Sequence, residues 1–198
     1  MPAQNKEQAR VLIDKTLTYE KLKLPESQYM ERAVLVAGVD AGYAPTHGNG
    51  QINYLEAQYA NAEQGINAET FKYPESGEQR EAILEEVDQG AGLVNYTAHC
   101  NEGGWLDPGF SRDDVAQLQA SGRYGLVIGN CCLSARFSIN TSFGEALVRA
   151  PEKGAVGYIG GTNYTYWNED FWWSVGATEI SADPVYDEHL GMYDKVFH

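Results

Sequence analysis

The sequence predicts one α/β domain built on a mostly parallel β-sheet with helices on both faces. Short apolar runs alternate with segments of helical periodicity along the chain, and this alternation favours parallel strands joined by helical crossovers. The runs are continuously apolar, which is typical of strands buried on both faces. A length of 198 residues and an apolar content of 43% fit one globular domain with a sizeable core.

The elements of this fold can be placed in chain order. Apolar residues at roughly helical intervals predict a helix over residues 5–23, ended by Pro25; these residues are Val11, Ile13, Leu17 and Leu22. Apolar runs predict strands at residues 33–39, 71–73, 93–97, 126–128 and 155–159. Further helices are expected at residues 51–64, 75–89, 113–120 and 143–149, and a last one beginning in the aromatic segment YWNEDFWWSVG. The inner face of the helix at 75–89 is expected to carry Ile83, Leu84 and Val87.

The net charge of the chain limits the classes of partner that it can attract. Lys and Arg number 14 against 28 Asp and Glu, a net charge of −14. This excess argues against nucleic-acid binding and against anionic membrane surfaces, and it would attract a basic partner or substrate. Solubility alone explains it equally well. No apolar stretch is long enough to cross a membrane, and the N-terminal residues MPAQNKEQAR contain no apolar signal core, so we expect no membrane insertion.

The cysteines suggest reactivity rather than scaffolding. The chain has three, Cys100, Cys131 and Cys132, too few and too oddly placed for a disulfide framework, and no Cys/His spacing matches a zinc site. Adjacent residues project differently, so only one of Cys131 and Cys132 can occupy a given site. We therefore expect one of them to be functional and no metal site.

Three predicted strands end in groups that can carry chemistry. Asp40 follows AVLVAGV, His99 follows LVNYT and Cys132 follows GLVIGN. If the strands are parallel, these ends meet at the edge of the sheet where ligands bind. A thiol with an ordinary pKa near 8.5 needs a base; a histidine supplies one, and a carboxylate can orient that histidine. Each residue alone is more often structural, but their coincidence favours a nucleophilic site.

Around these residues the sequence resembles the gingipain family of cysteine peptidases, most closely its lysine-specific members. The matching segments are NYTAHCNEGGWLDP, IGNCCLSARF and FGEALVRAPEKGAVGYIGGTNYTYWNEDFWWSVGA. The resemblance runs from about Ala33 to the end and is strongest from Val94 to Ala177. It implies a caspase-like fold, hydrolysis of peptide bonds after a basic residue, protein or peptide substrates with basic residues, and a protein secreted by a bacterium or held at its surface.

The resemblance also assigns the catalytic residues. It implies that Cys132 is the nucleophile, His99 its base and Asp40 the orienting acid, with Cys131 pointing into the structure. The backbone N–H groups of Cys132 and Cys100 would bind the oxyanion. The family usually has glycine at position 100, so a side chain there is expected to crowd the site or strain the backbone. A second thiol near Cys132 also makes an inactivating Cys100–Cys132 disulfide conceivable.

The segment TYWNED resembles the part of the lysine-specific enzymes that forms the pocket for the residue before the cut. The family's aspartate falls on Asp170, its tryptophan wall on Trp167, and a threonine that helps to hold the ammonium falls on Thr97. A buried ammonium needs a carboxylate and other acceptors, and the lysine stem packs well on an indole. The alternative is that these aromatics belong to the core and that Asp170 is only an early helix acid. We expect that alternative for Trp172 and Trp173.

Two further functions stay open beside a lysine-preferring cysteine endopeptidase. One is a catalytically inactive module with the same scaffold that serves binding or assembly, and the other is an arginine-preferring peptidase. The family's catalytic region is longer than residues 1–198, so we expect this single domain to be a fragment or a reduced form of it. No cofactor is required by the chemistry, and the resemblance allows structural calcium without indicating its ligands.

Overall fold

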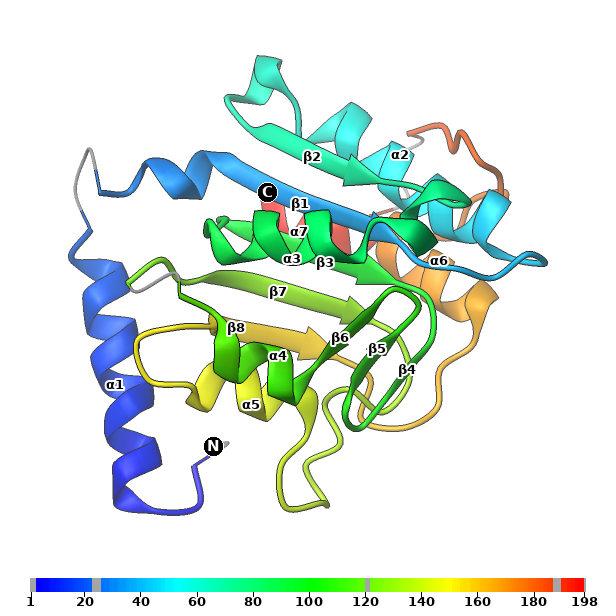
Figure 1. Cartoon of the computed structure of the whole chain (residues 1–198). Helices are drawn as coiled ribbons and strands as arrows, with labels where there is room; N and C mark the ends of the chain where they lie inside the picture. Colours follow the sequence, from blue (N-terminus) through cyan, green and yellow to red (C-terminus); the bar gives the residue numbers. More distant parts are fainter. Residues whose placement is uncertain (1–2, 23–25, 120–121, 187–189, 198) are drawn as a thin grey trace.

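The computed structural model describes residues 3–22, 26–119, 122–186 and 190–197. It confirms the α/β class: a parallel sheet of five strands in the order β2-β1-β3-β7-β8 is covered by helices on both faces (Figure 1). The strands are β1 (Arg32–Ala37), β2 (Asn67–Phe71), β3 (Leu93–Thr97), β7 (Gly125–Asn130) and β8 (Ala155–Gly160). The helices are α1 (Lys6–Glu20), α2 (Asn49–Gln58), α3 (Arg80–Asp88), α4 (Arg112–Gln117), α5 (Phe143–Arg149), α6 (Trp167–Val175) and α7 (Met192–Phe197).

The central strands are mostly apolar and almost entirely buried because each face of the sheet packs against a separate core. Along β1, Val34 and Val36 join the core under α3, α4 and α5, whereas Leu35 and Ala37 join the core under α2, α6 and α7. Alternate side chains of a strand point to opposite faces, so both sets are buried. A continuous apolar run therefore indicated a doubly covered strand correctly.

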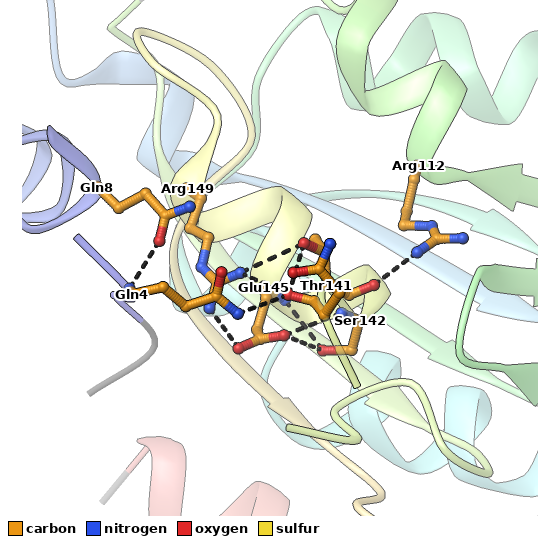
Figure 2. A network of polar contacts seen from close by, with 8 residues as sticks. Gln4, Gln8, Arg112, Thr141, Ser142, Glu145 and Arg149 are labelled. Carbon is orange, nitrogen blue, oxygen red and sulfur yellow. Dashed lines mark hydrogen bonds and ion pairs between the residues drawn. The ribbon is translucent and has the colours of Figure 1, made fainter. Parts of the chain in front are cut away.

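Side chains fix the start of α5. Ser142 accepts a hydrogen bond from the Glu145 N–H at 3.5 Å, and Glu145 accepts one in return from the Ser142 N–H at 2.9 Å. Figure 2 shows Glu145 lying between Ser142 and Arg149, to which it is also ion-paired. This reciprocal capping satisfies donors that a helix start leaves unpaired. The helix consequently begins at Phe143, as the sequence predicts.

Several boundaries differ from the expectation. The edge strand β2 ends at Phe71, where we expected a strand to begin; α2 ends at Gln58; and α3 begins at Arg80 after a single turn of 3-10 helix. Helix α4 begins at Arg112 and ends at Gln117, and residue 120 of the expected helix lies outside the described residues, as does Pro25. Hydrophobic periodicity does not detect these ends, because it reports which face is buried and not where a helix or strand stops.

A second, antiparallel sheet was not predicted. It consists of β4 (Cys100–Asn101), β5 (Gly104–Leu106) and β6 (Gly109–Ser111), and it follows β3 directly. Strands of two or three residues are too short to show a polarity pattern. The small sheet matters because it begins one residue after His99. Helix α7 was also not predicted, and no described helix is long and apolar enough to cross a bilayer.

Helix α1 forms where expected but buries a different face. Ile13 and Leu17 are 53% and 43% exposed, whereas Lys15 is only 3% exposed. The Lys15 amino group donates hydrogen bonds to the carbonyls of four residues at the end of α5 and just beyond it, at 2.6–3.2 Å: Leu147, Val148, Ala150 and Lys153. Burial lowers its pKa to about 7. Lys15 thus satisfies helix-end carbonyls that would otherwise lack a donor.

Replacing Lys15 with methionine is expected to lower the free energy of unfolding by about 3 kcal/mol, because several buried carbonyls lose their donor. Urea unfolding followed by circular dichroism measures this difference. The matched control is Lys6→Met at the exposed start of the same helix, where a change of no more than about 0.5 kcal/mol is expected. Equal effects of the two substitutions would contradict a capping role for Lys15.

Candidate active site

The three reactive strand-end residues line one cavity. Asp40, His99 and Cys132 all face a space of about 530 Å³ at the carboxyl ends of β1, β3 and β7. Figure 1 shows these strands ending on the same side of the sheet, next to α6 and the β4–β6 sheet. The expectation that parallel strands bring these residues to one edge therefore holds geometrically.

Asp40 holds the imidazole of His99. Its Oδ2 atom lies 2.7 Å from His99 Nε2, while Oδ1 accepts hydrogen bonds from the N–H groups of Gly42 and Tyr43 at 2.9 and 3.0 Å. Burial alone would raise the pKa of Asp40, but these three hydrogen bonds hold it below its ordinary value. An ionised Asp40 fixes the ring through Nε2. Nδ1 is then the nitrogen that remains for proton exchange with a reacting group.

The backbone of His99 is also fixed. Its carbonyl accepts hydrogen bonds from the Leu106 N–H at 3.0 Å and from the Tyr96 hydroxyl at 2.9 Å. Tyr96 is fully buried and stacks on Trp105 of β5, with ring centroids 4.3 Å apart. The small sheet that follows His99 therefore anchors it to β3.

The sulfur of Cys132 faces Thr165. It accepts a hydrogen bond from the Thr165 N–H at 3.4 Å, and it lies 3.5 Å from the Thr165 carbonyl oxygen and 3.8 Å from Oγ1. Cys132 and His99 share the cavity, but no hydrogen bond joins them in the described part of the chain. Proton transfer between the two thus needs a side-chain rotation or an intervening substrate group.

The turn that carries Cys132 is fixed by its own backbone. Leu133 has a φ of 58°, a left-handed conformation that is unusual for a residue other than glycine. Its N–H donates to the Asn163 carbonyl at 3.0 Å, and the Ala135 N–H donates to the Gly161 carbonyl at 2.9 Å. Backbone strain of this kind often occurs at functional sites. Here the two hydrogen bonds hold the turn after β7 against the loop before α6.

The cysteine pairing differs from the Cys100–Cys132 bond that the sequence analysis considered. Cys100 forms a disulfide with Cys131, with Cα atoms 5.4 Å apart, and Cys132 keeps its free thiol. The chain therefore does contain a disulfide, and Cys100 does not pair with Cys132. Cys131 is fully buried, as the resemblance implies. The sequence argument failed because it counted cysteines without the register, in which the pairing of β3 with β7 ends at Thr97 and Asn130 and leaves Cys100 and Cys131 just beyond it.

Asp170 also lines the cavity, from the first turn of α6. Burial raises its pKa to about 6, opposed by a hydrogen bond from Thr165 Oγ1 to its Oδ2 atom at 2.8 Å and supported by the nearby Glu169. A partly buried carboxylate without a cation is poorly stabilised. The arrangement suits a positively charged ligand group that enters the cavity.

Trp167 forms a wall of the cavity, supported by residues that the sequence analysis missed. Its indole stacks on Tyr43, with centroids 5.7 Å apart and planes 9° apart, and it meets His99 edge-on at 5.6 Å. His47 lies against the same indole and bonds to Asn168 through Nε2 at 2.8 Å. Tyr43 and His47 lie in AGYAPTHGNG, interpreted only as a loop; its position directly after Asp40 was the available signal.

Three further residues, Thr97, Trp172 and Trp173, were assigned from the sequence, and their positions in the structure differ. Thr97 is fully buried and does not line the cavity, but within the described residues its Oγ1 has no hydrogen-bond partner. It lies in register with Asn130, whose amide donates to the Asp170 carbonyl at 2.9 Å. Trp172 and Trp173 are each 42% exposed, so the expectation that they are core residues is wrong. Phe171, between Asp170 and these two, takes the buried position instead.

Thr165 is a further residue of the site that the sequence analysis missed. It contacts both the Cys132 sulfur and the Asp170 carboxylate. Threonine is common in loops, so only the structure reveals this double contact. The described residues hold no group of three His, Cys, Asp or Glu side chains fit to bind a metal ion.

Comparison with known proteins agrees with this geometry. The model of peptidase family C25 matches residues 1–197. Lys-gingipain of Porphyromonas gingivalis is 37% identical over 200 residues, which cover all of this chain and 11% of that protein. Gingipain R2 of the same organism is 26% identical over 152 residues, covering 76% of this chain and 21% of that protein.

Solved structures show the same relationship. One titled "Structure of Protease" has a TM-score of 0.88 and 35% identity, covering 98% of this chain and 43% of its own. The Arg-specific cysteine proteinase gingipain R has a TM-score of 0.69 and 25% identity, covering 87% and 41%. The fold is thus the caspase-like fold of these proteases, and the chain spans only part of each relative. From the family match along nearly its whole length, the chain belongs to peptidase family C25, the family of the gingipains.

Proposed function

We propose that this chain carries the catalytic site of a cysteine endopeptidase that cleaves after basic residues and prefers lysine. The observation that carries the proposal is one cavity lined by the Asp40–His99 pair, the free thiol of Cys132 and the partly buried acid Asp170. The relatives named for lysine and for arginine support a basic residue before the cut. The higher identity to Lys-gingipain, 37% against 26% for gingipain R2, supports lysine.

In the proposed reaction Cys132 attacks the carbonyl carbon of the scissile bond. His99 takes the thiol proton through Nδ1, after a side-chain rotation or through an intervening substrate group, because Asp40 engages Nε2. The backbone N–H groups of Cys132 and Cys100 bind the oxyanion of the tetrahedral intermediate. His99 then protonates the leaving amine, and water hydrolyses the thioester with His99 as base. Every step uses the chain's own residues, without a cofactor.

Lysine selectivity follows from Asp170 and Trp167. The substrate ammonium supplies the countercharge that the Asp170 carboxylate does not find among the described residues, and the methylene stem packs on the partly buried indole of Trp167. The favourable binding free energy comes from replacing a desolvated single charge with an ion pair.

The direct test is a set of peptides that differ only in the residue before the cut: lysine, arginine, norleucine and glutamine. We expect kcat/KM to be highest for lysine, lower for arginine and at least about 100-fold lower for norleucine, which keeps the stem without the charge. Competition between lysyl and arginyl peptides separates the two basic preferences. Equal cleavage of norleucine and lysine would contradict the proposed pocket.

Thr165 is expected to position the Asp170 carboxylate through its hydroxyl group. Thr165→Val removes the hydrogen bond to the carboxylate and should lower kcat/KM for the lysyl peptide about tenfold. Thr165→Ser keeps the hydroxyl and is the matched control, with a change of no more than about twofold expected. If valine and serine have the same effect, the hydroxyl has no role in the pocket.

We also propose that the protein works in an oxidising compartment, secreted or at the cell surface. The buried Cys100–Cys131 bond supports this, because disulfides persist mainly outside the reducing cytosol. The net charge of −14 supports peptides with basic residues as partners rather than nucleic acids. Fractionation of the source organism followed by immunoblotting tests the location, and a purely cytosolic protein would contradict it.

A further inference from the structure

The disulfide links the two reactive residues through their nearest neighbours in the chain. Cys100 follows His99 directly, and Cys131 precedes Cys132 directly. The two cysteines are 31 positions apart, at the ends of segments that leave β3 and β7. A single covalent bond therefore joins the segment that carries the base to the segment that carries the nucleophile.

Backbone pairing does not make this link. The ladder between β3 and β7 ends at Thr97 and Asn130, before either reactive residue. Beyond that point His99 is tied to Asp40, Tyr96 and Leu106. Cys132 is tied to Thr165 on the other side of the cavity. Each reactive group thus has its own supports. The disulfide connects the two segments covalently, and further along them the Arg136–Glu102 ion pair at 2.8 Å and the hydrogen bond from the Phe143 N–H to the Glu102 carbonyl at 2.9 Å add non-covalent contacts.

The two kinds of sulfur differ in accessibility. Cys100 is 7% exposed and Cys131 fully buried, in the core cluster that contains Trp105 and Phe143. Cys132 is partly exposed and lines the cavity. Thiol–disulfide exchange requires access of a thiolate to the bond. A mild monothiol should therefore release an adduct from Cys132 while the buried bond stays intact.

We propose that the Cys100–Cys131 disulfide sets the separation of His99 and Cys132, so that full activity requires this bond oxidised and Cys132 reduced. Cys100 and Cys131 are then positioning residues. Two thiols form the bond by losing two protons and two electrons to an oxidised disulfide compound, which leaves as two thiols. The inference rests on the proposed peptidase function. It predicts a large rate effect because misplacing a base by about 1 Å can cost about 100-fold.

The test compares wild type with the double variant Cys100→Ala/Cys131→Ala, which leaves no spare thiol that could pair with Cys132. The lysyl peptide gives kcat and KM. The rate at which iodoacetamide alkylates Cys132, measured over a range of pH, gives the reactivity of the thiol. This small reagent does not need the Asp170 pocket for binding. His99→Ala is the reference for a thiol without its base.

We expect kcat to fall about 10- to 100-fold with KM within about twofold of wild type, because the Asp170 pocket is untouched. The pH profile of alkylation should shift to that of His99→Ala. A double variant with wild-type kcat and profile would overturn the proposal and leave the bond a purely structural role. If wild type cleaves no basic peptide, the proposed function fails, whereas the alkylation profiles still decide the positioning.

Graded reduction keeps the proposal testable if the double variant does not fold. The folded wild type is titrated with dithiothreitol, which gives two electrons to the bond and becomes a cyclic disulfide, and free thiols are trapped for peptide mapping. Activity should fall in proportion to opening of the Cys100–Cys131 bond and return on reoxidation. Undiminished activity with the bond fully open and the fold intact would overturn the proposal.

Discussion

Replacing Cys132 with alanine is expected to lower kcat for a lysyl peptide about 10⁴-fold or more, because the thiol forms the covalent intermediate. His99→Ala should have a similar effect, since the base acts only through that thiol. Residues that act as one unit are not additive. The double variant Cys132→Ala/His99→Ala should therefore be no slower than the slower single variant.

Initial rates at saturating peptide measure these losses, and thermal unfolding shows whether the variants keep their fold. Both side chains line an open cavity, so we expect little change in melting temperature. Cys132→Ala also leaves the Cys100–Cys131 bond in place, which peptide mapping without reductant checks. Activity of Cys132→Ala within about tenfold of wild type would exclude it as the nucleophile.

Asp170→Asn is expected to lower kcat/KM for the lysyl peptide about 100- to 1,000-fold, because the substrate ammonium loses its ion-pair partner in a partly desolvated site. The pH dependence gives a second readout. The Asp170 carboxyl group, with its pKa near 6, is ionised above that pH, so wild-type kcat/KM on lysine should fall as the pH drops through about 6. Peptide cleavage by the asparagine variant should lack that inflection.

The control for Asp170→Asn is Glu169→Gln, which removes the adjacent negative charge in the same turn of α6. We expect a change in kcat/KM of about twofold, since exposed charges contribute little.

The free energy of unfolding gives an independent test of the raised pKa of Asp170. The folded-state pKa of Asp170 is raised above the ordinary 3.8, so its contribution to stability is present below about pH 4 and is lost as the pH rises through about 6. Asp170→Asn should therefore be more stable than wild type at pH 7.

The sequence predicted the centre of the fold well because its signals are local. Strands β1, β3, β7 and β8 are short and mostly apolar, and parallel strands must end at one edge, so the meeting of Asp40, His99 and Cys132 followed from topology. Resemblance to the gingipains added the roles of Asp170 and Trp167, and both residues line the cavity.

What the sequence missed depends on contacts between distant segments. The Lys15 amino group is buried because the end of α5 offers carbonyls, and no pattern within α1 shows this. The Cys100–Cys131 bond depends on the register of β3 with β7. Thr165 matters only because its loop lies between Cys132 and Asp170. Such features become visible once the strand order is known.

The most direct measurement of the central claim is labelling with a lysyl chloromethyl ketone followed by peptide mapping. We predict that the reagent alkylates Cys132 alone, that a lysyl peptide slows the reaction and a norleucyl peptide does not, and that His99→Ala or Asp170→Asn largely abolishes it. An unmodified Cys132 with the Cys100–Cys131 bond intact would contradict the account and indicate a binding module on a peptidase scaffold.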